Sequence, residues 1–168
     1  DDVVGNGTHV SAIAAAETDN GIGTAGVARE ASIGSFKVCY EDLSLAIFGI
    51  ILSLCEDEDI AEAIIQATNS GYQVINMSLA GPQPSATLEN AVNYAWSQGV
   101  VVVAGAGNDY SPTKQYPAAF ENVIGVGATD RYDNQAYFSS FSTNTDDWVS
   151  VVAPAVVNMS AVPRELCG

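Results

Sequence analysis

The sequence has few basic residues and a single histidine, and these shortages exclude several kinds of function. Five lysines and arginines stand against twenty aspartates and glutamates, so the net charge of the 168-residue chain is −15. A chain this acidic repels phosphate backbones and anionic headgroups, which excludes nucleic acids and anionic membranes as partners. The three cysteines and the one histidine show no zinc-site spacing. An acidic surface instead suits a secreted or salt-tolerant protein.

The sequence also lacks an apolar run long enough to cross a membrane, and it lacks a secretory leader. Residues 43–54 are strongly apolar but too few to span a bilayer. The chain starts at Asp1-Asp2-Val3 without a signal peptide, so either processing removed a leader or the sequence is a fragment.

Two of the cysteines, Cys39 and Cys55, flank this apolar stretch. A disulfide between them would close its base and would indicate an oxidising compartment. The alternative is a pair of buried free thiols. The stretch itself has two interpretations: an exposed patch for a partner or adjacent domain, or additional core.

The remaining sequence predicts one α/β domain with a core of its own. Apolar residues make up 48% of the chain and charged residues only 15%, which is typical of a globular protein. Segments with strand and helix patterns alternate, and the connections between them are short, which favours a doubly wound, mostly parallel sheet. We expect helices over residues 8–17, 57–70 and 86–98, and strands over residues 31–38, 74–79, 100–104, 123–128 and 149–153.

Asn108 is the most informative single residue. It follows the continuous apolar run of residues 100–104, as expected of a parallel strand covered on both faces. In open α/β sheets, ligands bind at the carboxyl ends of such strands. A side-chain amide there can donate to an oxyanion, and the neighbouring glycines allow a substrate backbone to approach. The alternative is a plain glycine-rich turn.

A set of short segments occurs in a fixed order along the chain: Gly7-Thr-His-Val10, residues 20–28, 74–81 and 104–108, Tyr116-Pro117, residues 123–128, Phe138-Ser-Ser140 and Val152-Ala-Pro154. Taken together, these segments resemble the subtilisin-like serine proteases (subtilases). The resemblance implies a three-layer, subtilisin-like sheet and one partial catalytic domain over residues 1–168, incomplete at both ends, with an apolar insert at about 40–55. It also implies a secreted endopeptidase that hydrolyses polypeptides through an acyl-enzyme and uses no organic cofactor.

The resemblance also assigns roles to particular residues. Asn108 matches the side-chain oxyanion donor. Two groups of residues match the substrate site: an edge that pairs with the peptide backbone and the wall of a specificity pocket. They are Ser78, Leu79, Ala80 and Gly81 for the edge, and Ala104, Gly105, Ala106 and Gly107 for the wall. Ala80 stands where glycine is usual, which predicts tighter access for a peptide.

A calcium loop is implied as well, at Thr18, Asn20, Ile22 and Thr24. Asn20 would bind through its side chain and the others mainly through backbone carbonyls, and oxygen ligands suit a hard cation. The family's acidic ligand would precede Asp1, which weakens the calcium prediction. A plain glycine turn is the alternative.

The catalytic triad is where this sequence departs from the family. The position of the catalytic histidine is occupied by Asn6, or a Gly-His pair has been lost there; in either case the base is gone. His9 matches the motif's second histidine and is expected to pack rather than to catalyse. Asp1 and Asp2 are too close to His9 to be the orienting aspartate, and Ser160 is a poor match for the nucleophile.

We therefore expect an inactive, partial subtilase domain, and keep a non-catalytic peptide-binding module as the alternative. The missing base favours the module, whereas the retained Asn108 and peptide-binding edge favour the protease domain. Nucleotide binding is disfavoured, because Gly21, Gly23 and Gly26 follow a helix pattern rather than a strand. For stability, we expect the chain to need missing domain segments or a partner chain.

Overall fold

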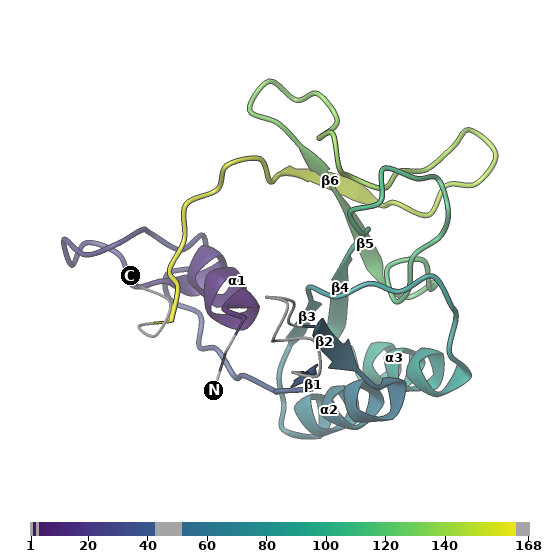
Figure 1. The fold of residues 1–168 in the computed structure, drawn as a ribbon. Coiled ribbons are helices and arrows are strands. Elements are labelled where there is room, and N and C mark those ends of the chain that lie inside the picture. The colour runs from purple at the N-terminus through teal and green to yellow at the C-terminus, as the bar shows by residue number, and fades with distance from the viewer. Residues whose placement is uncertain (1, 3, 43–51, 164–168) are drawn as a thin grey trace. The chain divides into compact units, whose positions relative to one another are not determined.

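Residues 2, 4–42 and 52–163 are described by a computed structural model, and the chain falls into two units (Figure 1). Unit 1 combines residues 1–55 with residues 158–168, and unit 2 is the continuous segment 56–157. The candidate site residues that follow the sheet lie in unit 2.

Unit 2 is built on a four-stranded parallel sheet. Its strands are β3 (Val74–Met77), β4 (Val101–Gly105), β5 (Ile124–Thr129) and β6 (Val151–Pro154), and they lie side by side in sequence order. Gly125 in β5 is required by close packing. A Cβ there would lie 2.8 Å from the carbonyl oxygen of Ala118 and 2.9 Å from that of Trp148. All four strands end at the same edge, which is where the polar site residues follow.

Two helices, α2 (Asp57–Asn69) and α3 (Ala86–Ser97), pack against each other in unit 2 (Figure 1). The first turn of α2 consists of acidic residues, which its helix dipole stabilises. The N-cap of α3 is Ser85, whose Oγ accepts a hydrogen bond from the Leu88 N–H at 3.4 Å. Apolar residues at helical spacing are buried on both helices, and β4 adds its own buried residues to this core. They are Ile60, Ala61, Ile64, Ala67, Leu88, Ala91, Val92, Ala95, Val102 and Ala104.

The alternate positions of the same strands carry apolar side chains that remain exposed. Val74 pairs with Val101, and Val126 pairs with Val151, so these side chains share one face of the sheet. Val74 is 58% exposed and Val151 is 51% exposed. The sheet of unit 2 is therefore well covered on one face and much less on the other.

Unit 1 contains the helix α1 (Asn6–Ala15) and a two-stranded antiparallel sheet of β1 (Cys39–Asp42) and β2 (Leu52–Cys55). The chain runs back along the end of α1: the Val27 N–H donates to the carbonyl of Ile13 at 3.0 Å. Residue 26 must be glycine there, because a Cβ would lie 2.2 Å from the backbone nitrogen of Ala16. Cys39 and Cys55 face each other across the two strands and form a disulfide.

The α/β class and the parallel sheet are confirmed, and the expected helices and the last four strands all form, with ends shifted by a few residues. The strand expected over residues 31–38 is wrong. That segment has no regular secondary structure, and the nearby strand is β1, which pairs only with β2. The residue types of this segment favour a strand, but a strand also needs a neighbouring strand to pair with its backbone hydrogen-bonding groups.

The expectations for the cysteines and the apolar insert are confirmed only where the structure describes the residues. The disulfide interpretation of Cys39 and Cys55 holds, and the free-thiol alternative is wrong. The ends of the apolar insert form β1 and β2, while its centre, residues 43–51, lies outside the described residues. Cys167 and Asp1 also lie outside them. The single domain over residues 1–168 stays a prediction.

Candidate functional site

A cleft of about 330 Å³ opens at the carboxyl edge of the sheet in unit 2. Its apolar floor comes from the ends of β4, β5 and β6 and from the small residues that follow β4. Six of the residues predicted from the sequence line it together: Ser78, Ala104, Gly105, Ala106, Gly107 and Asn108. The remaining lining residues are Asn76, Val103, Val126, Gly127, Ala128, Phe138, Ser139, Ala153 and Ala155.

Asn108 reaches the cleft because the chain leaves the sheet in two steps. β4 ends at Gly105, but the Ala106 N–H still donates to the carbonyl of Val126 in β5, at 2.8 Å. Gly107 then turns the backbone with a φ of +92°, a value that side chains other than glycine rarely adopt. Asn108 follows this turn and is exposed at the cleft. Its amide group is thus available to a ligand that enters the cleft.

The predicted peptide-binding edge reaches the cleft through one residue. Ser78 lines it, and its Oγ accepts a hydrogen bond from Asn76 Nδ2 at 3.0 Å. Leu79, Ala80 and Gly81 do not line it. Gly81 is instead paired with Tyr116 by two backbone hydrogen bonds of 2.9 and 2.7 Å. Whether this edge pairs with a peptide stays a prediction.

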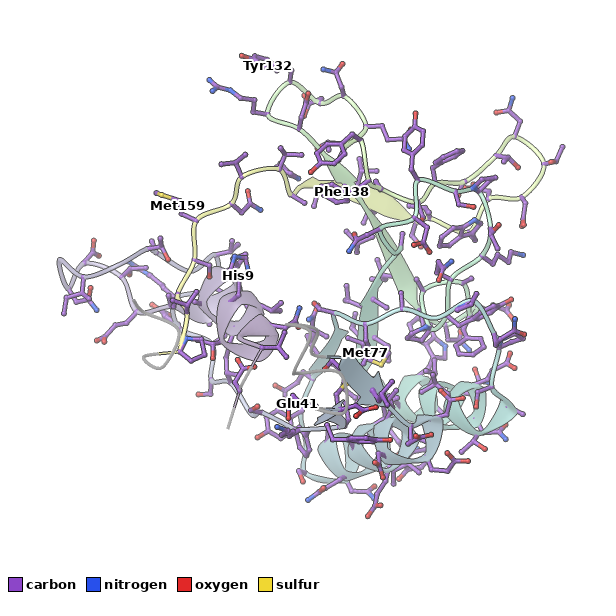
Figure 2. The ribbon with its side chains drawn as sticks, viewed as in Figure 1. His9, Glu41, Met77, Tyr132, Phe138 and Met159 are labelled. Carbon is purple, nitrogen blue, oxygen red and sulfur yellow. A yellow bond between two sulfur atoms is a disulfide. The ribbon has the colours of Figure 1, made fainter. Side chains whose placement is uncertain are left out.

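Phe138 and Ser139 were not predicted as site residues, yet both line the cleft (Phe138 is labelled in Figure 2). The signal was present, because the segment Phe138-Ser-Ser140 is one of those that resemble the subtilases. Spacing alone did not show that it lies against the Asn108 loop.

Comparisons with known proteins identify the family of this chain. The chain matches the Subtilase family over residues 1–165. The chain belongs to the subtilase family. It is 47% identical over 161 residues to the thermophilic serine proteinase of Bacillus sp. (strain AK1), covering 96% of this chain and 37% of that protein. It is 42% identical to subtilisin BL of Lederbergia lenta, covering 95% of this chain and 54% of the relative.

The fold of this subtilase chain is likewise shared with a solved protease from Pseudoalteromonas arctica PAMC 21717. The two superpose with a TM-score of 0.71 at 35% sequence identity, over 87% of this chain and 42% of the other. The fold is therefore a partial, subtilisin-like α/β fold. The chain spans about half or less of the length of these relatives. Among the described residues, no helix is both long and apolar enough to cross a membrane.

In this subtilase chain, the residues matched to the triad region lie in unit 1. Asn6 is the first residue of α1 and is exposed, and His9 lies one turn further along the helix (labelled in Figure 2). The carbonyl oxygen of His9 accepts a hydrogen bond from Ser160 Oγ at 2.6 Å. The Ser160 hydroxyl thus donates to a backbone carbonyl, not to an imidazole nitrogen.

Asp2 holds the start of α1. Its carboxylate accepts hydrogen bonds from the Thr8 N–H at 2.6 Å and from the Gly5 N–H at 3.1 Å. The pKa of Asp2 is lowered, first by a side-chain hydrogen bond with Thr8 and then by the backbone N–H of Thr8. Gly5, at the N-cap, has no side chain to offer, so Asp2 does the capping from outside the helix.

The predicted calcium ligands lie together on one exposed loop. Residues 17–25 enclose a hollow of about 190 Å³. Asn20 Oδ1 accepts the Ile22 N–H at 3.0 Å, and Asn20 Nδ2 lies 3.5 Å from Glu17 Oε2. The donors are oxygens, which match a hard cation in kind, but calcium takes six to eight of them and the predicted set has four. Calcium binding by this loop stays a prediction.

Proposed function

We propose that this chain is part of a subtilisin-like serine endopeptidase domain and supplies the cleft in which a polypeptide's carbonyl meets its oxyanion donor. The observation that carries the proposal is the position of Asn108. It follows the parallel strand β4, past a glycine turn, at the mouth of a cleft walled by small residues. Such a wall lets an extended peptide backbone come close to the sheet.

The chemistry expected of Asn108 is the stabilisation of negative charge. When a carbonyl is attacked, its oxygen becomes an oxyanion, and a donor already aimed at that oxygen stabilises it without reorganising. In a subtilisin, loss of such a side-chain donor is known to cost about 10²–10³ in turnover. The same amide would also bind the carboxylate of a cleaved peptide, because a product carboxylate places an anionic oxygen at the same point.

We also propose that the chain, as its sequence stands, does not hydrolyse peptides. Asn6 occupies the position of the family's catalytic base, and an amide neither takes up nor releases a proton near neutral pH. The nearby His9 is half-buried on α1, and the Ser160 hydroxyl already donates to its backbone carbonyl. This favours the second candidate, a non-catalytic module that keeps the cleft for binding peptides.

The test uses one peptide in two forms: Ala-Ala-Ala-Leu with a free carboxylate, and the same peptide with an amidated end. Titration followed by calorimetry should show tighter binding of the carboxylate form, by about tenfold, as a hydrogen bond to a charged group predicts. In Asn108→Leu, which keeps the bulk and loses the donor, the two forms should bind alike. Equal binding of both forms by the wild type would refute the proposal.

A second test separates the protease domain from the binding module. A fluorophosphonate probe reacts with an activated serine, so we expect no labelling of this chain. Labelling at Ser160, removed by Ser160→Ala, would show an active nucleophile and overturn the proposed inactivity.

We propose an extracellular or secretory location for the chain. The Cys39–Cys55 disulfide supports this, because such bonds persist in oxidising compartments.

A further inference from the structure

We propose that Ser140 is a positioning residue that fixes the backbone at Asn108 and with it the direction of the Asn108 Cα–Cβ bond. The inference rests on the proposed role of Asn108 as the donor to an anionic oxygen. It concerns a buried serine that does not line the cleft and was not among the predicted site residues.

Ser140 holds both neighbours of Asn108. Its backbone N–H donates to the carbonyl of Gly107 at 3.0 Å, on one side of Asn108. Its Oγ accepts a hydrogen bond from the Asp109 N–H at 3.3 Å, on the other side. Because one residue binds the chain before and after Asn108, the Asn108 backbone has little freedom to rotate, and the direction of its Cα–Cβ bond is set.

Ser140 is itself buried. Ser140 is 1% exposed, whereas Asn108 is exposed at the cleft. Gly107 also packs closely against it: a Cβ on Gly107 would lie 3.4 Å from Ser140 Oγ and 3.0 Å from Gln115 Cγ. Gln115 is 4% exposed, so the Gly107 turn packs against two buried side chains, those of Ser140 and Gln115.

Three further contacts extend this attachment along both segments. The Tyr110 N–H donates to the carbonyl of Phe138 at 2.9 Å, and the Phe141 N–H donates to the carbonyl of Ser111 at 3.1 Å. The rings of Tyr110 and Phe141 meet edge to face, with their centroids 5.6 Å apart. Residues 107–111 have no regular secondary structure, yet they are bound along their length to residues 138–141.

The functional consequence follows from preorganisation. A donor stabilises an oxyanion best when its direction is fixed before the charge develops, and a donor on a loose loop must first be ordered. Ser140 orders the loop through its hydrogen bonds to Gly107 and Asp109, and it does not line the cleft where the ligand would bind. Its loss should therefore reduce the preference for an anionic oxygen more than it reduces peptide binding as a whole.

The experiment compares Ser140→Ala with Ser142→Ala, using the same carboxylate and amide forms of Ala-Ala-Ala-Leu. Ser142 is a matched control: its Oγ also accepts backbone N–H groups, from Trp148 at 2.9 Å and Val149 at 2.7 Å, but it does not line the cleft. We expect Ser140→Ala to lower the carboxylate preference at least threefold while the affinity for the amide form changes little. Ser142→Ala should keep the wild-type ratio.

A second measurement needs no variant and applies even if Ser140→Ala fails to fold. In the wild type, the Asp109 amide should exchange its hydrogen at least tenfold more slowly than in an unstructured peptide. Heteronuclear relaxation should show the Asn108 backbone as rigid as β4. A wild-type ratio in Ser140→Ala, or a mobile Asn108 with an unprotected Asp109 amide, would overturn the inference.

The two proposals fail separately. If the wild type binds both peptide forms equally, the proposed role of Asn108 falls, and the exchange and relaxation data alone decide whether Ser140 holds the loop. If the wild type prefers the carboxylate and Ser140→Ala keeps that preference, only the role of Ser140 falls.

Discussion

Replacing Gly107 with alanine should destabilise unit 2 through the loop that carries Asn108. Two costs add at this position. Its φ of +92° lies in the left-handed region, which costs an ordinary L-residue about 1–2 kcal/mol. The new Cβ would also lie 3.0 Å from Cγ of the buried Gln115, and overpacking of this kind typically costs about 1–3 kcal/mol.

One gain partly offsets these costs. Alanine restricts the unfolded chain more than glycine does, which returns roughly 0.4–1 kcal/mol. The free energy of unfolding should therefore fall by about 1–5 kcal/mol. For a chain of this length, that corresponds to a fall in Tm of roughly 2–20 °C.

Gly105→Ala is the matched control, only two positions away. A Cβ on Gly105 has no heavy atom within 4 Å, and its φ is not positive, so the free energy of unfolding should change by less than about 1 kcal/mol. Urea unfolding followed by fluorescence is the assay, since Trp148 in unit 2 is only 7% exposed and should report its loss of burial. Equal midpoints for the two variants would refute the steric argument.

Three other predictions concern unit 1. Asp2→Asn should lower the stability of α1 by about 0.3–1 kcal/mol at neutral pH, because it removes a negative charge from the N-terminus of the helix and keeps an acceptor oxygen. Because the folded pKa of Asp2 is lowered from 3.8, its contribution is complete above that pH and is lost as the pH falls through the folded value. Circular dichroism should then show wild type and variant converging in acid, and a constant gap would contradict this assignment. Reducing the Cys39–Cys55 disulfide should abolish the slow amide hydrogen exchange of β1 and β2, because an isolated two-stranded sheet is only marginally stable in water. Unchanged protection of these amides would show that other contacts hold the two strands together. If the loop binds calcium, about 10 mM Ca²⁺ should raise the Tm of the wild type and not that of Asn20→Ala, whereas identical melts with calcium and with chelator would eliminate the site.

Much of the fold could be predicted from local patterns. The apolar run before Gly105 predicts a parallel strand, and β4 forms there and ends at Gly105. The expectation that both of its faces are covered is wrong, because burial alternates along β4 and Val101 is 36% exposed. The helices follow from apolar spacing and from a cap such as Ser85. The segment 31–38 shows the limit of this reasoning. Its composition suits a strand, but a strand forms only where another strand supplies its hydrogen bonds.

The candidate site was predictable residue by residue, but its assembly was not. The sequence placed Asn108 and the small residues of the cleft, and the likeness to the subtilases located the change at Asn6. Only the tertiary structure brings Ser140, which lies 31 positions beyond Asp109, against the loop that carries Asn108. Local sequence determines where a strand or turn ends, because that depends on neighbouring residues. Which distant segment then holds that end in place depends on how the whole chain packs.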